Sequence, residues 1–437
     1  KYKARDILDS FCNQMEANKT IASLEKKKEI MNELDWRIAS IRLRLGSIAW
    51  DVEEPHNAQI ELDLAAEFYT PGIVTEIEQI SGQIGSDISK DIPEDMIAPD
   101  VNVVKIEFCA DAMKCLNLLG ILWAGRDHAK RSFLYLLASK KIYDNNISNS
   151  NLTIKQKEEM ESTLTHNLFY LAQAYGNNGN PKLSSYYCQQ TLQRQLIAGL
   201  DVKSGIEWVK NCMGMADFHT ALRNTKSAAY ALGAAENVFN SLLKPLLISS
   251  NNSENTTLSS NDLDRNEKIK EIEDDLNRRW ITLDVGILKV AMENKKVNDP
   301  EAQSVFKFDK SSNDNHSTVP DHFKFPSLEV IEIQLSTPEE IITFENAREV
   351  FLRAVTKLEI AKQTFPLEGF VTDHVQLVRQ HSLLYHYLSS FETDIKRKLA
   401  MELRRAEMLR PFINSLGRTA YEKLHKEISY ELGEVYL

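Results

Sequence analysis

The sequence has few of the residues that interrupt helices. Among 437 residues it contains only 16 glycines and 12 prolines, so it has few of the strongest breaks in regular structure. Strict alternation of apolar and polar residues, the pattern of half-buried strands, is scarce. Charged residues make up 26% of the chain, as in ordinary globular proteins. The sequence therefore predicts an all-α fold.

Long apolar runs and a secretory signal are also missing. No stretch approaches the roughly 20 apolar residues of a membrane span, and no signal peptide is visible. The number of cysteines is odd and no Cys-x-x-Cys pair occurs, so we expect reduced, buried thiols of a cytoplasmic protein rather than disulfides or a metal site. The chain is predicted not to insert into a membrane. The cysteines are Cys12, Cys109, Cys115, Cys188 and Cys212.

An excess of positive charge is absent too. The formal net charge is −11, which argues against nucleic acid as a partner, because its binders normally carry a basic field. Two interpretations of the acidity stay open. It suits a partner with a basic docking face, since opposite potentials speed encounter, or it simply maintains solubility.

The sequence also lacks the short motifs of common active sites: there is no Walker A loop, GxGxxG, HExxH or GxSxG. The nearest metal-like pair is His374 and His381. Seven residues span about 10 Å along a helix, too far for two ligands of one ion. Thr372 and Asp373 are instead expected as a helix N-cap and a first-turn acid. We therefore expect no catalytic residue, no metal, no cofactor and no small-molecule substrate.

What the sequence does contain is a repeated spacing pattern of small residues, which we call the mask. A small residue is followed 12, 16 and 19 positions later by residues that are mostly small, large and small. This spacing is typical of tetratricopeptide repeats, in which small residues let paired helices approach closely. The four sets are Gly46, Ala58, Leu62 and Ala65; Gly120, Ser132, Leu136 and Ser139; Ala172, Ser184, Cys188 and Thr191; and Ala216, Ala228, Leu232 and Ala235.

The units are spaced unevenly, at intervals of 74, 52 and 44 residues, against about 34 in the ideal repeat. Longer helices, longer loops or both would explain this. The mask predicts a right-handed superhelix of tetratricopeptide-like helical hairpins, an α-solenoid with long helices and disordered linkers. The alternative is four ordinary amphipathic helix pairs that carry small residues by chance.

Composition divides the chain into three predicted parts. Residues 1–247 form an N-terminal repeat subdomain. Residues 248–336 form a linker region with a long helix near 262–294. Residues 337–437 form a truncated C-terminal repeat subdomain.

Within the linker region, the polar segments 249–261 and 298–326 are expected to be disordered, and 328–335 to be a single strand or an extended tether. Thr337 is expected to cap a helix that starts with Pro338. At the end of the chain, Gly433 and Tyr436 resemble the first helix of a further unit. We therefore expect the chain to be an internal piece of a longer protein.

Several segments carry a likeness to a known family, and in two of them, Val371 to His374 and Phe391 to Asp394, the repeat mask does not require it. Over most of residues 110–437 the chain resembles the kinesin-binding protein family. The segments are Asn117 to Trp123, Thr165 to Tyr175, Tyr187 with Cys188, Leu192 to Leu196, Gly369 to His374 and Ser390 to Asp394.

The resemblance implies a non-enzymatic tetratricopeptide superhelix that binds kinesin motor domains. Its concave groove would grip the microtubule-binding surface of the motor and keep the motor off its track. The implied setting is the cytoplasm and the cytoskeleton. The implied processes are microtubule organisation, axonal and mitochondrial transport, neurogenesis and differentiation.

The resemblance also implies partner-binding residues. Tyr170, Gln173 and Gln195 match the motor-contacting residues of the family in type. Gly214 and Asp217 replace longer neutral polar side chains, and Asp217 puts an acid on the groove. The repeat pattern agrees, because first helices line the inner groove of stacked hairpins. Gln173 and Asp217 each follow the small residue of their first helix.

A second hypothesis is a generic peptide-binding co-chaperone or scaffold. Such domains hold a C-terminal carboxylate with several Lys and Arg residues on successive first helices. The third and fourth units offer His166, Gln173, Lys210 and Asp217 at the relevant positions. These residues make a poor clamp.

Overall fold

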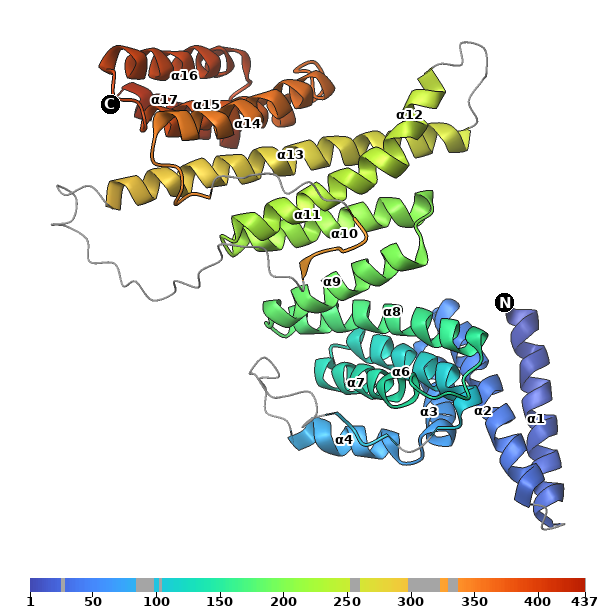
Figure 1. The fold of residues 1–437 in the computed structure, drawn as a ribbon. Coiled ribbons are helices and arrows are strands. Elements are labelled where there is room, and N and C mark those ends of the chain that lie inside the picture. The colour runs from blue at the N-terminus through green and yellow to red at the C-terminus, as the bar shows by residue number, and fades with distance from the viewer. Residues whose placement is uncertain are drawn as a thin grey trace. The chain divides into compact units, whose positions relative to one another are not determined.

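A computed structural model describes residues 1–24, 28–83, 98–101, 104–251, 260–297, 323–328 and 337–436. Helices account for nearly all of these residues, and no strand occurs among them (Figure 1). The predicted all-α fold is confirmed. Contacts between residues group the chain into two compact units, Lys1–Gln195 (unit 1) and Leu196–Leu437 (unit 2).

Unit 1 is a series of antiparallel helix pairs. The well-packed pairs are α2 with α3 and α6 with α7, while α1 packs on α2 and α4 on α7. Helices α8 and α9 pair through the stacked rings of Tyr175 and Tyr187. The helices are α1 (Tyr2–Leu24), α2 (Lys28–Asp51), α3 (Pro55–Tyr69), α4 (Ile73–Gln83), the 3-10 turn η1 (Ile106–Phe108), α6 (Cys109–Ala124), α7 (Ala129–Asn146), α8 (Ile154–Asn177) and α9 (Pro181–Ala198), whose last residues pass into unit 2.

The small residues of the mask lie where the two helices of a pair touch. A β-carbon added to Gly46 would stand 2.6 Å from Leu62 Cγ, and one on Gly120 would stand 2.8 Å from Leu136 Cγ. Both distances are shorter than any ordinary contact, so the pairs α2/α3 and α6/α7 need glycine at these points. The predicted α-solenoid of helical hairpins is therefore confirmed within the units.

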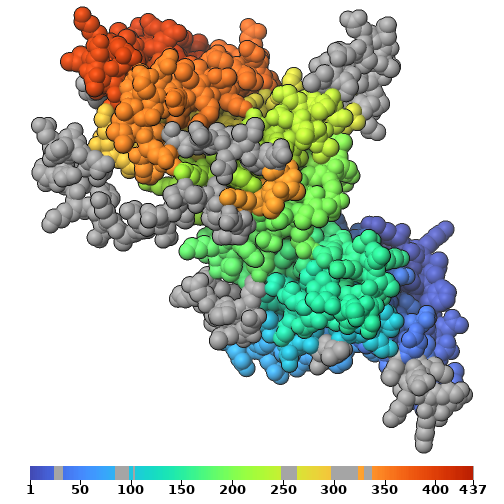
Figure 2. All heavy atoms as spheres, in the orientation of Figure 1, coloured from blue at the N-terminus to red at the C-terminus, as the bar shows by residue number. Residues whose placement is uncertain are grey.

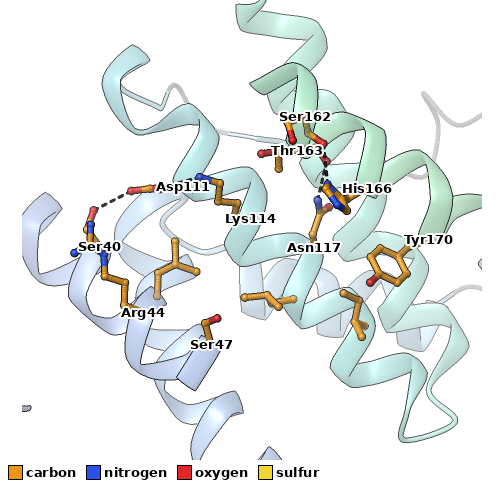
Figure 3. Close-up of a pocket in the computed structure, with 13 residues that line it drawn as sticks. Ser40, Arg44, Ser47, Asp111, Lys114, Asn117, Ser162, Thr163, His166 and Tyr170 are labelled. Atoms are coloured by element: carbon orange, nitrogen blue, oxygen red, sulfur yellow. Dashed lines mark hydrogen bonds and ion pairs between the residues drawn. The ribbon is translucent and has the colours of Figure 1, made fainter. Parts of the chain in front are cut away.

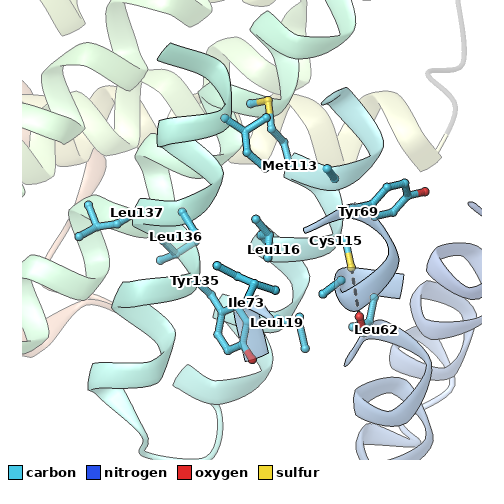
Figure 4. Packing of buried hydrophobic residues seen from close by; sticks show 14 of the residues in the cluster. Leu62, Tyr69, Ile73, Met113, Cys115, Leu116, Leu119, Tyr135, Leu136 and Leu137 are labelled. Atoms are coloured by element: carbon cyan, nitrogen blue, oxygen red, sulfur yellow. Dashed lines mark hydrogen bonds between the residues drawn. The ribbon is translucent and has the colours of Figure 1, made fainter. Parts of the chain in front are cut away.

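The core of unit 1 lies between the helices of these pairs (Figure 4). Leu116 and Leu119 of α6 pack with Tyr135 and Leu136 of α7, and all four are buried. Cys115 Sγ donates a hydrogen bond to the carbonyl oxygen of Leu62, 3.3 Å away. On the face of unit 1 seen in Figure 2, side chains cover the spaces that the ribbon drawing leaves between the helices. Protein interiors are close-packed in the same way.

The cysteines behave as expected. All five lie in the described ranges, none forms a disulfide, and only Cys188 is not fully buried. Burial raises the pKa of the Cys109 and Cys188 thiols to about 11. Protonated thiols inside an apolar core are poor nucleophiles and poor metal ligands.

Unit 2 continues the same pairing. The pairs are α10 with α11, α13 with α14, and α15 with α16, and α17 packs on α16. The helices are α10 (Val202–Ala221), α11 (Thr225–Val238), the π-helical turn η2 (Phe239–Leu243), α12 (Lys244–Asn251), α13 (Ser260–Val297), α14 (Phe344–Thr364), α15 (Val371–Ser389), α16 (Ile395–Ser415) and α17 (Glu422–Tyr436).

The long helix expected near 262–294 is present as α13, and it packs on α10, α11, α14 and α15. Asp284 of α13 is fully buried and accepts a hydrogen bond from Arg353 Nε of α14, with an N–O distance of 3.1 Å. Burial raises the pKa of Asp284, and the guanidinium opposes this shift.

The division of the chain at residues 247 and 336 stays a prediction.

Two predicted helix starts are wrong. The residues from Thr337 to Glu340 form a turn, and α14 begins only at Phe344, where Thr343 Oγ1 accepts a hydrogen bond from the Asn346 amide. Glu340 instead accepts a hydrogen bond from the Thr337 amide, which closes the turn locally. Likewise Phe370, not Thr372, is the N-cap of α15.

Parts of the predicted linkers are ordered. Residues 249–251 end α12, and residues 260 and 261 begin α13, so disorder was the wrong expectation for both ends of the first polar segment. Residues 252–259 lie outside the described residues, as do 298–322 of the second polar segment. The predicted strand or tether also lies outside them, except for Leu328.

Candidate partner-binding site

The first helices of the three pairs in unit 1 share one hollowed face. Helices α2, α6 and α8 border a hollow of about 520 Å³ (Figure 3). Its lining mixes polar and charged side chains with three aliphatic ones. The lining residues are Ser40, Leu43, Arg44 and Ser47 of α2; Asp111, Lys114, Asn117, Leu118 and Ile121 of α6; and Ser162, Thr163, His166 and Tyr170 of α8.

Asp111 is the acidic group of the hollow. Ser40 Oγ donates a hydrogen bond to Asp111 Oδ2 over 3.1 Å, and Lys114 Nζ lies 3.8 Å from Asp111 Oδ1. Arg44 is exposed on the same side of the hollow. The hollow therefore carries two cations and one anion, although the whole chain is acidic.

Buried amides make the floor rigid. Asn167 Nδ2 donates to Asn117 Oδ1 at 2.7 Å and to the carbonyl oxygen of Leu136 at 2.9 Å. Asn117 Nδ2 donates in turn to the carbonyl oxygen of Thr163 at 3.3 Å. These bonds join α6, α7 and α8 by polar contacts that are costly to break in a dry interior. The hollow is therefore preformed.

Tyr170 and Gln173 are brought together at this face. Tyr170 is half-buried on α8 and borders both the first hollow and a neighbouring one of about 500 Å³, which Gln173 also lines. Gln173 itself is exposed. Aromatic residues such as Tyr170 are enriched at protein–protein interfaces.

Gln195 lies near the end of α9 and is half-buried. Its Oε1 atom is buried and makes no hydrogen bond with any part of the chain that the structure describes. A buried amide oxygen without a donor is costly.

Gly214 and Asp217 lie on α10, in unit 2, so the five predicted residues form two groups. Both are exposed. A β-carbon on Gly214 would meet no atom within 4 Å, so packing does not require glycine there. Asp217 Oδ2 accepts a hydrogen bond from Arg279 Nε of α13 at 3.0 Å. The acid predicted on the groove is therefore paired with a cation of its own chain.

The repeat register links these residues to others that the sequence reasoning missed. Tyr170 and Gly214 lie two positions before the small residue of their first helices, and the equivalent positions are Arg44 and Leu118. Gln173 and Asp217 lie one position after it, and the equivalents are Ser47 and Ile121. All four equivalents line the hollow. Applying the same repeat positions to the first two units would have identified these four residues from the sequence.

The histidines of α15 have structural partners. His374 Nδ1 lies 2.8 Å from the carbonyl oxygen of Phe365, and His381 Nδ1 lies 2.9 Å from Lys362 Nζ. Burial, helped by Lys362, lowers the pKa of His381 to about 4. Asp373 is in the first turn, as expected, and pairs with Arg278 at 2.9 Å.

Two kinds of feature are absent from the described ranges. They contain no group of three or more His, Cys, Asp or Glu residues arranged to hold a metal ion. They also contain no helix whose length and apolar character would let it cross a membrane.

The sequence profile of the family described as "KIF-1 binding protein C terminal" matches residues 206–437, more than half of the chain. The chain belongs to this family. The match covers α11 to α17 and nearly all of α10. The predicted membership is therefore confirmed.

Curated relatives extend the match. The chain is 27% identical over 348 residues to the KIF-binding protein of Bos taurus (73% of this chain, 55% of that protein) and 27% identical over 359 residues to that of Homo sapiens (76% and 56%). To that of Drosophila melanogaster it is 22% identical over 458 residues (100% and 69%). The chain thus spans about half the length of the vertebrate relatives.

Among solved structures, the chain is similar to a circular tandem repeat protein with a novel repeat topology. The two are 13% identical, and the match covers 100% of this chain and 97% of the other, but the TM-score is 0.23. A score this low supports no argument about shared architecture or function.

Proposed function

We propose that this chain is part of a non-enzymatic adaptor that binds kinesin motor domains. The observation that carries the proposal is the membership in the KIF-1 binding protein C terminal family, together with relatives named KIF-binding protein. The hollowed face of α2, α6 and α8 supports it, because Tyr170 and Gln173 lie together on a preformed surface.

The proposed mechanism is competition with the microtubule. The chain grips the microtubule-binding surface of the motor in its groove and so prevents the motor from landing. A preformed surface loses little conformational entropy on binding, and a net charge of −11 speeds encounter with a basic motor surface. Through its kinesin partners the chain would act in the cytoplasm and at the cytoskeleton, in axonal and mitochondrial transport, neurogenesis and differentiation.

The local charges refine this mechanism. Arg44 and Lys114 lie in the hollow beside Asp111, and Asp217 is paired with Arg279. The contacts near Tyr170 would therefore be aromatic and amide contacts, while the acidity of the chain as a whole contributes long-range attraction.

A motor-landing assay tests the proposal. A panel of kinesin motor domains is observed on immobilised microtubules with increasing concentrations of this chain. Landing of at least one kinesin should fall towards zero as the chain saturates the motor. Normal landing of every kinesin tested, at saturating protein, would refute the proposal.

One observation favours the second hypothesis, a peptide-binding scaffold. Arg44, Lys114 and His166 come from three successive first helices and line one hollow, which is more basic than the third and fourth units alone predicted. Calorimetry with an acidic peptide, free or amidated at its C-terminus, tests it. Tighter binding of the free carboxylate, lost in Arg44→Ala, would support a carboxylate clamp.

A further inference from the structure

A short segment of unit 2, residues 323–328, packs against α10 and α11 outside any helix pair (Figure 1). Its sequence is Phe-Lys-Phe-Pro-Ser-Leu. Phe325 is its anchor, with 1% of its surface exposed. The Phe325 ring lies edge-on to Trp208 of α10, with centroids 5.4 Å apart, and is stacked near Tyr230 of α11 at 6.1 Å.

Phe323 makes a second aromatic contact with α10. Its ring meets His219 edge-on, with centroids 5.1 Å apart. Such edge-to-face pairs are favourable beyond the area they bury. In the chain, Lys324 separates the two phenylalanines. The segment therefore contacts α10 through two rings, at two separate points.

The backbone of the segment is recognised as well. The Phe325 amide donates a hydrogen bond to Tyr230 Oη over 2.6 Å, and the Leu328 amide donates to the carbonyl oxygen of Phe325 over 3.0 Å. Sites that recognise short peptides combine apolar pockets for side chains with a few polar groups that bind the backbone. Here the two rings make the apolar contacts, and Tyr230 Oη binds the backbone.

The surface that Phe323 and Phe325 contact belongs to the helix pair α10/α11. Contacts between these two helices themselves stabilise the pair. Trp208 and His219 are buried on α10. Cys212 Sγ of α10 donates a hydrogen bond to the carbonyl oxygen of Ala231 on α11 at 3.2 Å, and the small residues Ala216 and Ala228 are buried. The pair α10/α11 is therefore held together by contacts that do not involve the segment.

The segment is remote in sequence from this surface. Phe325 follows Tyr230 by 95 residues, and residues 298–322 separate the segment from the end of α13. Its contacts with α10 and α11 are therefore tertiary contacts made by a segment that is not part of either helix.

We propose that the surface around Trp208, His219 and Tyr230 is a binding site for a peptide with two phenylalanines separated by one residue, and that Phe323-Lys324-Phe325 occupies it within the chain. Because this contact is intramolecular, a separate peptide competes poorly with it. A partner with the same Phe-x-Phe pattern binds when the segment of the chain is displaced. The site lies on α10, the helix that also carries Gly214 and Asp217, but it does not depend on kinesin binding.

Calorimetry on the full chain tests the site. The probe is a capped peptide with the sequence of residues 321–328. We expect it to bind the double variant Phe323→Ala/Phe325→Ala at least tenfold more tightly than it binds the unchanged chain, whose site is occupied. The same peptide with alanine at both phenylalanine positions should bind neither protein.

A further variant tests the backbone contact. Tyr230→Phe, added to the double variant, keeps the ring but removes the hydroxyl that accepts the Phe325 amide, so the peptide should bind several-fold more weakly. Equal affinity for the unchanged chain and the double variant would overturn the proposal, as would no binding to a double variant with normal helix content. If the double variant does not fold, Phe323→Ala alone serves, and failure of the peptide to bind it more tightly than the unchanged chain overturns the proposal.

Discussion

Asp217 of α10 and Arg279 of α13 form an ion pair, with Arg279 Nε 3.0 Å from Asp217 Oδ2. The two residues are 62 positions apart in the chain. The pair is partly exposed, so its own contribution to stability is small. Its consequence concerns binding, because the guanidinium offsets the one acid that the sequence places among the predicted partner-binding residues.

Removal of this cation should strengthen binding to a basic motor surface. We expect Arg279→Ala to raise the affinity for a susceptible kinesin motor about 1.4- to fivefold, in line with about 0.2–1 kcal/mol for an exposed charge pair. Arg278→Ala is the matched control, because it removes the same charge but frees Asp373 instead. Affinities measured at two salt concentrations check this, and equal effects of the two variants would contradict it.

The aromatic and amide contacts of α8 should carry more affinity. We expect Tyr170→Ala with Gln173→Ala to weaken motor binding about thirtyfold or more, since truncated central aromatic contacts cost about 2 kcal/mol or more. Circular dichroism should show unchanged helix content. Tyr186→Ala, on α9 and outside both hollows, is the control. Unchanged affinity of the double variant in a motor pull-down would refute the assignment.

Gly120 should be required for the pairing of α6 with α7. A β-carbon there would stand 2.8 Å from Leu136 Cγ, so we expect Gly120→Ala to destabilise the chain by about 1–3 kcal/mol, as overpacking does. Gly286→Ala in α13 is the control, because its β-carbon would meet nothing within 4 Å. Urea denaturation measures both. Equal stability of the two variants would argue against the close approach.

His381 should make stability depend on pH. Its pKa is about 4 in the folded chain and about 6.5 when unfolded. Between these values the unfolded chain binds more protons, so the free energy of unfolding rises with pH from about 4 to about 6.5. We expect His381→Gln to flatten this rise by about 1–3 kcal/mol. His56→Gln, at an exposed position, should leave it unchanged, and an equally steep rise in both variants would contradict the assignment.

The helix pairs were predictable from sequence because their contacts are local. Gly46 meets Leu62 and Gly120 meets Leu136, in each case 16 positions along the chain, and small residues at this spacing have few other uses. Helix starts were less predictable. Thr337 and Thr343 both have the residue type of a cap, and only packing after Phe344 decides which of them begins α14.

The candidate site was predictable in part. The family resemblance proposed Tyr170 and Gln173, and the repeat register agrees for Gln173, but neither revealed that Lys114 and His166 line the same hollow. Neither revealed that Asp217 is paired. These relations join helices that are distant in sequence, and no spacing rule describes them.

By itself, the sequence determined the all-α class and the helix pairs, because helix periodicity and small-residue spacing act over short distances along the chain. The family followed from the resemblance of particular segments. Only the tertiary structure decided which polar groups meet. The pairing of Asp217 with Arg279 and the packing of Phe325 against Trp208 depend on how α10, α11 and α13 pack together, and packing brings together residues that are far apart in sequence.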